Sequence, residues 1–248
     1  MRAFWLSLAL LSTLALAQSH ATGAEPEFRP ALIGNGPKAL VNMIDTQKLM
    51  ARGQNDALIM FDGLVSRGNP LRYARSAKWH VYRGTPGSEL LQQELLNKLG
   101  AAEFVPAIAN HKPVDVVFHG TALFMVKDLK PHLRIYANQN HEDIKEGNDF
   151  IAPQLIIETA DWQVSAFDLV LEKARAYGQN GAIQLLISVD AAGNQRDLKV
   201  MLEDPPGFGF GDAIRKTYAK AKYIPGFRNG RPVDSTFEST EYFRRWKY

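Results

Sequence analysis

Cysteine is absent from the 248 residues of this chain, which excludes disulfide bonds and thiolate metal sites. Long apolar runs are also absent after the first 16 residues, although a membrane-spanning helix needs about 20 apolar residues in succession. The six histidines form no pair four residues apart, as helical zinc sites require, and no Gly-x-Ser-x-Gly nucleophile motif occurs. We therefore expect no enzymatic activity, no metal site and no cofactor.

The chain also lacks a large excess of positive or negative charge. The formal net charge is +3, and no basic stretch is interleaved with aromatic residues in the way that nucleic-acid-binding grooves are. Nucleic acid is therefore not expected as a partner. With 46% hydrophobic and 22% charged residues, the chain has the composition of a folded protein rather than a disordered one.

The N-terminus has the pattern of a secretory signal peptide. Arg2 supplies a positive charge, residues 3–16 are apolar, and Ala15 and Ala17 form a small-x-small cleavage site. We expect a signal peptide over residues 1–17, with cleavage as late as residue 24, and export to the periplasm. The alternative is an uncleaved N-terminus that anchors the chain in the inner membrane.

Two stretches of the chain are copies of each other. Ala102–Thr121 and Ala221–Thr240 align without a gap at an offset of 119 residues and share Ala, Pro, Asn, Pro-Val-Asp, Phe and Thr. Apolar residues before the copies coincide at the same offset: Leu91, Leu95 and Leu99 correspond to Phe210, Ile214 and Tyr218. The chain is therefore predicted to contain one unit twice.

Each copy is preceded by the same succession of patterns. Residues 37–52 and 165–178 predict helices, alternating apolar residues then predict a hairpin, and a second helix and a third strand follow. The predicted fold class is α+β, with two tandem units of order α-β-β-α-β, each a small three-stranded antiparallel sheet packed by helices. We expect one domain over residues 37–126, a partly packed linker over 127–164 and a second domain over 165–248.

Local signals predict several boundaries within these units. Thr85 with Pro86 predicts the start of a helix, because threonine caps helices and proline fits the first turn. Apolar residues at alternate positions from Ile183 to Val189 predict the buried face of a strand, and those from Leu198 to Leu202 the buried face of its partner. Residues 18–36, which are polar and contain Pro and Gly, predict a mobile lead-in.

The second copy resembles the C-terminal domain of TonB-type energy transducers. That family has an aromatic-x-Pro pattern, then Asn-Gly-Lys/Arg-Pro-Val, then a closing strand that ends in an aromatic residue. The matching residues here are Tyr223, Pro225, Asn229, Gly230, Arg231, Pro232, Val233, Phe237 and Phe243. The resemblance covers residues 183–243 well and residues 57–126 in a degenerate form, in which His111 replaces the glycine and a different turn is expected.

The resemblance implies a periplasmic module that binds an outer-membrane receptor, or another envelope protein, by pairing a short peptide with its sheet edge. On this basis the partner-binding edge strand carries Thr236, Glu238, Thr240 and Tyr242 on its solvent side. The family also implies a link to TonB-dependent transmembrane transport. The chain has no long Pro-rich spacer, so we expect a soluble binding module rather than a transducer that transmits force.

The sequence is also compatible with other functions. The protein could be an envelope scaffold without a transport role, whose two domains pair with each other, or two copies could associate through their edge strands. A small-ligand or enzymatic protein would need an enclosed pocket with converging polar groups. Within the repeat, Asp115 and Asp234 are interpreted as polar residues at strand starts, and His119 with Asp115 as a surface pair.

Overall fold

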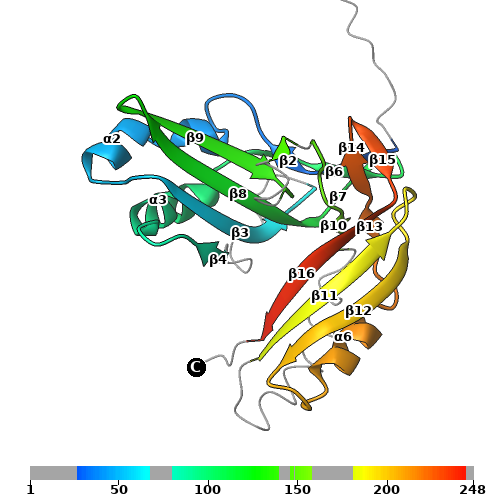
Figure 1. Ribbon diagram of the computed structural model, residues 1–248. Coiled ribbons are helices and arrows are strands. Elements are labelled where there is room, and N and C mark those ends of the chain that lie inside the picture. The colour runs from blue at the N-terminus through cyan, green and yellow to red at the C-terminus, as the bar shows by residue number, and fades with distance from the viewer. Residues whose placement is uncertain (1–26, 68–79, 140–145, 148, 158–180, 244–248) are drawn as a thin grey trace, which may run out of the picture.

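The computed structural model describes residues 27–67, 80–139, 146–147, 149–157 and 181–243, and these residues form an α+β fold (Figure 1). A four-stranded antiparallel sheet carries helices on one face, a three-stranded antiparallel sheet carries one described helix, and smaller sheets of two or three short strands connect them. The α+β class predicted from the sequence is therefore confirmed. The predicted signal peptide and the first helix of the second predicted domain lie outside the described residues.

The first sheet is the larger one, and its strands lie in the antiparallel order β4-β3-β8-β9. In chain order they are β3 (Ala57–Val65), β4 (His80–Gly84), β8 (Val116–Lys127) and β9 (Lys130–Ala137). The helix α3 (Glu89–Leu99) packs against the sheet through Leu91, Leu95 and Leu99, which are buried as predicted. The stretch predicted as a partly packed linker adds β9 to this sheet, as a fourth strand beside the three of the predicted unit.

The prediction of one continuous helix over residues 37–52 is wrong. The structure has two short helices there, α1 (Leu40–Met43) and α2 (Thr46–Ala51). The Asp45 carboxylate accepts the Lys48 backbone N–H at 2.9 Å and so caps a new helix. A local side-chain bond therefore interrupts what the apolar pattern alone reads as one helix.

The predicted start of α3 at Thr85 is also wrong. The Thr85 hydroxyl accepts the backbone N–H of Leu58 at 3.0 Å, so it joins the end of β4 to β3 instead of capping a helix. The N–H of Leu91, in the first turn of α3, donates to the side-chain oxygen of the buried Gln54 at 2.8 Å. A residue 37 positions away thus satisfies the helix terminus, which local capping rules could not predict.

The second sheet has the antiparallel order β12-β11-β16, with α6 on one face. The elements are β11 (Gly181–Val189), β12 (Gln195–Asp204), α6 (Phe210–Tyr218) and β16 (Ser235–Phe243). The predicted alternate residues from Ile183 to Val189 are buried, which confirms the strand and its face. In β12 a register shift between Val200 and Leu202 breaks the alternation, so Leu202 is 49% exposed and its predicted burial is wrong.

Each half contains a small hairpin before the third strand of its main sheet, β8 in the first half and β16 in the second. The connector strands are β5 (Phe104–Val105), β6 (Ala107–Ala109) and β7 (Lys112–Val114) in the first half, and β13 (Tyr223–Ile224), β14 (Gly226–Arg228) and β15 (Arg231–Val233) in the second. The turn residues have positive φ in both hairpins: 49° and 61° at Asn110 and His111, and 51° and 70° at Asn229 and Gly230. The prediction that His111 produces a different turn is wrong, because this histidine adopts the left-handed conformation that two-residue hairpins require.

His111→Gly is expected to stabilise the protein by about 1 kcal/mol, because a left-handed conformation costs a non-glycine residue about 1–2 kcal/mol. The reciprocal change Gly230→His is expected to destabilise it by a similar amount. Urea unfolding of the two variants and the wild type measures both differences. Equal midpoints for all three proteins would contradict the prediction.

Short strands that precede each half pair with these connectors. β1 (Phe28–Arg29) pairs with β6, and β2 (Leu32–Ile33) pairs with β5. The prediction of a mobile lead-in is therefore wrong for its described part, where backbone pairing and the full burial of Ala31 fix the chain. β10 (Gln154–Leu155), from the stretch predicted as a linker, pairs with β13 in the second half.

The two halves share a hydrophobic core at their connectors. Ile224 and Phe227 of the second half belong to the hydrophobic cluster that also contains the buried residues of the first sheet. The side chain of Gln154, 1% exposed, accepts the Ala31 N–H at 2.7 Å and donates to the Ala31 carbonyl at 3.0 Å and to Asn138 Oδ1 at 2.8 Å. Three separate segments of the chain therefore meet at one buried amide, and one of them lies 123 residues before Gln154.

Candidate functional site

β16 is the last described strand and lies at one edge of the second sheet, on the side nearer to the first sheet (Figure 1). Within the described residues it pairs with β11 alone, in a register from Gly181 opposite Phe243 to Val189 opposite Ser235. An edge strand has one row of backbone N–H and C=O groups turned away from its own sheet. β16 therefore offers a template for another extended segment.

One face of β16 is fixed to β13 and α6. The ring of Phe237 meets the Tyr223 ring edge-on at a centroid distance of 5.9 Å. Glu241 accepts hydrogen bonds from Tyr218 Oη at 2.8 Å and from Ser239 Oγ at 3.2 Å. Burial, and next the Glu241 carboxylate, raise the pKa of Tyr218 well above its usual value, so the phenol keeps the proton that it donates.

The residues predicted to bind a partner lie on the other face of β16. Thr236 and Glu238 are exposed, and Thr240 is half-buried. The hydroxyls of Thr236 and Ser188 share a hydrogen bond of 2.9 Å, which ties this face to β11. Tyr242 belongs to the strand, but its side chain lies outside the described part. Three of the four predicted residues therefore share one face of an edge strand.

This face borders a cleft of about 880 Å³ between the two sheets. On the side of β16, its wall includes Gln184 and Leu186 of β11. The described residues of the opposite wall, from β3, β4 and β8, are Met60, Asp62, Arg83, His119 and Thr121. The volume falls within the range of about 300–1,000 Å³ that is usual for ligand sites. The sequence does not predict this wall, because its residues come from three separate strands.

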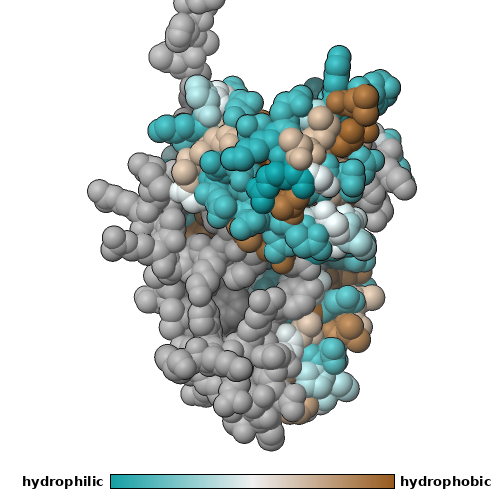
Figure 2. Space-filling model, turned by 90° about the vertical axis from the view of Figure 1, so that its left-hand side faces the viewer, coloured by the Kyte–Doolittle hydropathy of each residue, from teal (hydrophilic) through white to brown (hydrophobic). Residues whose placement is uncertain are grey.

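The exposed surface gives a further reason to consider the cleft. On the side of the molecule shown in Figure 2, hydrophilic residues cover most of the described surface, and hydrophobic residues form small separate patches. Such scattered apolar residues are normal on a protein surface and do not mark an interaction site. The described surface on this side therefore does not itself indicate a binding site.

A polar row crosses the first-sheet wall of the cleft. Asp62 and His119 are directly opposite each other in the β3–β8 register. The backbone N–H of His119 donates to Asn138 Oδ1 at 3.2 Å, and the backbone N–H of Asn138 donates to the His119 carbonyl at 2.7 Å. Burial lowers the pKa of His119, and the carboxylates of Asp62 and Glu241 oppose this shift. At neutral pH the imidazole is therefore mostly neutral, with one nitrogen as donor and one as acceptor.

The prediction that His119 and Asp115 form a surface pair is wrong. Asp115 is only 8% exposed, and its carboxylate accepts the Arg67 backbone N–H at 2.6 Å. Asp234, at the matching position of the second copy, accepts the Ala191 backbone N–H at 2.7 Å. Both aspartates therefore join the start of a third strand to the turn after the first strand of its hairpin.

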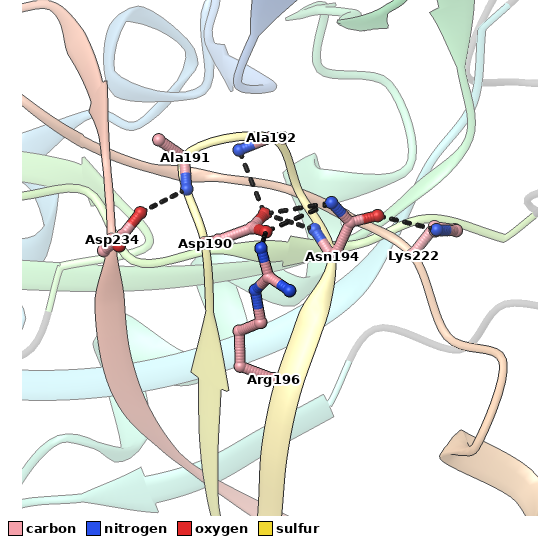
Figure 3. A network of polar contacts seen from close by, with 7 residues as sticks. All are labelled: Asp190, Ala191, Ala192, Asn194, Arg196, Lys222 and Asp234. Atoms are coloured by element: carbon pink, nitrogen blue, oxygen red, sulfur yellow. Dashed lines mark hydrogen bonds and ion pairs between the residues drawn. The ribbon is translucent and has the colours of Figure 1, made fainter.

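The turn between β11 and β12 is held by its own polar network (Figure 3). Asp190 Oδ1 accepts the N–H groups of Ala192 and Asn194 at 3.0 and 2.8 Å, and Arg196 Nη2 lies 2.6 Å from Asp190 Oδ2. The Asn194 N–H is the largest cause of a lowered Asp190 pKa, so the carboxylate stays ionised. Asn194 Oδ1 accepts a hydrogen bond from Lys222 Nζ at 2.8 Å. These bonds fix the turn and leave the network a structural role.

The aromatic-x-Pro part of the family-like motif is also structural. Tyr223 and Pro225 are both buried, and Tyr223 Oη donates to Gln195 Oε1 at 3.1 Å. Burial, with a smaller contribution from Glu241, raises the pKa of Tyr223 far above its usual value. These residues therefore hold the connector in place beneath the sheet.

The rest of the motif forms the hairpin that leads into β16. Asn229 and Gly230 are its turn residues, and Arg231 and Pro232 are exposed on β15. Val233 is the one motif residue among these that lines the cleft. The motif therefore positions the edge strand more than it contributes side chains to the candidate site.

The described ranges contain no group of three His, Asp or Glu residues placed to hold a metal ion. No helix in the same ranges has the length and apolar composition needed to cross a membrane. Neither a protein-family model nor a curated protein matches the chain. Its function is therefore inferred from the edge strand, the cleft and the motif.

Proposed function

We propose that the chain is a periplasmic interaction module that binds an extended segment of an outer-membrane receptor, or of another envelope protein, by adding it as a strand to β16. The main support for this proposal is that the edge of β16, unpaired within the described residues, borders a cleft of about 880 Å³. Each backbone hydrogen bond contributes only about 0.5–1.5 kcal/mol net, so the bound segment must span several residues.

The tandem TonB-C-like architecture is part of this proposal. Three strands in each half have equivalent sheet orders, β4-β3-β8 and β12-β11-β16, and each half has a helix between its second strand and its connector. Asp115 and Asp234 hold equivalent turns, and both connector hairpins have two left-handed residues. These correspondences support a duplicated unit.

The resemblance supplies the class of partner, the link to TonB-dependent transport and the periplasmic location. Mass spectrometry of the native N-terminus tests the location. An intact Met1 in the membrane fraction would favour the alternative of an inner-membrane anchor.

A second candidate is an envelope scaffold whose halves pair with each other. The shared core around Ile224, Phe227 and Gln154 favours it, because the halves do contact each other there. That contact uses the connectors, however, and within the described residues it leaves the edge of β16 without a backbone partner. Strand addition is therefore the better supported function.

Proline substitutions at adjacent positions of β16 test strand addition. Neighbouring residues of an antiparallel strand direct their N–H groups to opposite sides. One of Ser239→Pro and Thr240→Pro therefore removes an outward donor, and the other removes a donor that faces β11. The outward variant is expected to keep its thermal midpoint within a few degrees and to weaken peptide binding about tenfold, which is the loss of roughly 1.4 kcal/mol.

The probes are peptides selected on the immobilised full chain from a phage-displayed library of random peptides, with affinities measured by calorimetry. Ser239→Ala and Thr240→Val are the matched controls, because they change the side chain but keep the backbone N–H, so each proline variant is compared with the control at its own position. Failure to select any peptide, or unchanged affinity in both proline variants, would show that β16 does not accept a strand.

A further inference from the structure

We infer that Arg228 binds a carboxylate of the segment that adds to β16, at the end of the cleft where this strand begins. The inference rests on the proposed function, because it concerns the chemistry of the same bound segment. It identifies the partner as an extended peptide that carries an acidic side chain, or its own C-terminus, at the position beside Arg228.

The cleft follows the edge of β16 as well as one of its faces. Every residue from Val233 to Thr240 lines it, although successive side chains of a strand point to opposite faces. The edge of the strand is therefore turned toward the cleft, and a segment added there lies inside the cleft.

The Phe150 ring places Arg228 near the start of β16. Arg228 belongs to the hairpin that leads into this strand (Figure 1), and its guanidinium carbon lies 5.3 Å from the centroid of the ring. Gly226 allows this arrangement, because a Cβ there would lie 3.0 Å from Phe150 Cε2 and closer still to Ser235 Oγ. The ring and the first residue of β16 therefore lie together over Gly226, and both line the cleft with Arg228.

Arg228 forms no ion pair within the described residues. Asp149 lies beside the same hairpin, but its carboxylate accepts the backbone N–H of Asn229. Asp234 follows the hairpin, and its carboxylate accepts the backbone N–H of Ala191 at 2.7 Å. The acidic side chains of this region therefore hold backbone turns, and the Arg228 guanidinium is left for an anion from outside the chain.

Two further features at this end of the cleft favour a carboxylate. Arg231, which is opposite Arg228 in the hairpin register, adds a second positive charge. Ser235 Oγ is buried and has no hydrogen-bond partner within the described residues. A carboxylate is an acceptor with two oxygens, and it matches the planar fork of a guanidinium with two parallel hydrogen bonds.

The occupant of the cleft is a single extended segment rather than the sheet edge of a second copy. Residues of the first sheet, such as Met60 and Thr121, form the wall opposite β16, so an added strand lies between two surfaces of the same chain. A second copy would have to bring its three-stranded sheet and α6 into a space of about 880 Å³. That volume is instead usual for a bound ligand.

The direction of the added strand determines the source of the carboxylate. A segment antiparallel to β16 has its C-terminal end beside Ser235, so either an acidic side chain or the C-terminus itself reaches Arg228. A parallel segment has its N-terminal end there, and only a side chain supplies the carboxylate.

A double-mutant cycle between protein and peptide tests the inference. Peptides selected on the full chain are synthesised with a free or an amidated C-terminus, and each acidic residue is replaced in turn by its amide. Affinities for the wild type and Arg228→Gln are measured by calorimetry. At one position, the loss caused by Arg228→Gln is expected to disappear with the peptide carboxylate, which gives a coupling of up to about fivefold in Kd. Coupling to amidation identifies the C-terminus, and coupling to an acidic residue identifies a side chain.

Arg52→Gln is the matched control, because it removes the same charge from an exposed arginine that does not line the cleft. It is expected to show no coupling to any peptide carboxylate. Arg228→Lys keeps the charge but not the planar fork, and is expected to retain part of the coupling. Arg228 is exposed, so its variants are expected to keep the thermal midpoint of the wild type.

Absence of coupling for Arg228→Gln, or an equal coupling for Arg52→Gln, would overturn the inference. Strand addition would remain intact if the outward proline variant still lost affinity. Unchanged affinity in both proline variants would instead overturn the proposed function. A wild-type dimer that the outward proline variant loses in sedimentation would identify a second copy as the occupant and overturn the inference as well.

Discussion

Gly193→Ala is expected to lower the free energy of unfolding by about 2–5 kcal/mol, as the sum of a backbone penalty and a steric one. Gly193 has a φ of 77°, in the left-handed region that disfavours a side chain. Its Cβ would also lie much closer to the Tyr223 carbonyl oxygen than real contacts allow. The Tyr223 N–H donates to the Gly193 carbonyl at 3.0 Å, so the two backbone segments cannot separate without losing this bond.

Gly207→Ala separates the two penalties. Gly207 has a similar φ of 82°, but a Cβ there would meet nothing within 4 Å. It is therefore expected to cost only the backbone penalty of about 1–2 kcal/mol. Urea unfolding of both variants measures the difference. Equal losses would show that the turn between β11 and β12 does not press on the connector as tightly as the contact indicates.

Gln154→Leu is the second change for which a large effect is expected, about 2–5 kcal/mol of stability. The substitution keeps the side chain's bulk but leaves the buried N–H and C=O of Ala31 without the bonds of 2.7 and 3.0 Å that Gln154 makes. A buried polar group that loses its partner costs about 1–3 kcal/mol. Asn138 Oδ1 still accepts the His119 N–H, so it contributes less to the loss.

Gln184→Leu is the control for this substitution, because Gln184 is exposed on β11 and the same change there is expected to cost less than about 0.5 kcal/mol. Hydrogen exchange of the Ala31 amide provides a local measurement beside chemical unfolding, since that N–H loses its acceptor in Gln154→Leu. An unaltered Ala31 exchange rate, with unaltered stability, would show that the buried amide does not hold the three segments together.

The parts of the fold that the sequence predicts correctly are those with local signals. Alternation from Ile183 to Val189 predicts β11 because its two faces have different environments throughout. The leucine stripe of α3 is correct for the same reason. The errors arise where one contact overrides the pattern, as Asp45 does between α1 and α2 and as the bulge in β12 does for Leu202. Strands of two residues, such as β1 and β10, are too short to show an alternation of apolar and polar residues.

The candidate site is predictable only on one side. The pattern of the last strand, with the family resemblance, identifies Thr236, Glu238 and Thr240 as a shared face of β16. The opposite wall gives no such signal, because Asp62 and His119 are 57 residues apart and become neighbours only through the pairing of β3 with β8. The spacing in the sequence instead favours Asp115 as the partner of His119. The Asp115 carboxylate, however, accepts a hydrogen bond from the backbone N–H of Arg67.

The pairing of β10 with β13 has a consequence for the autonomy of the second repeat. A fragment that starts at residue 165 would lack the strand that covers its connector, and would expose Ile224 and Phe227 to water. A longer fragment would have to include Ile151, whose backbone pairs with that of Phe227, and even then the first half supplies the cluster in which Ile224 and Phe227 are buried. The two halves therefore share one hydrophobic cluster, and a substitution in either half is expected to change the stability of both.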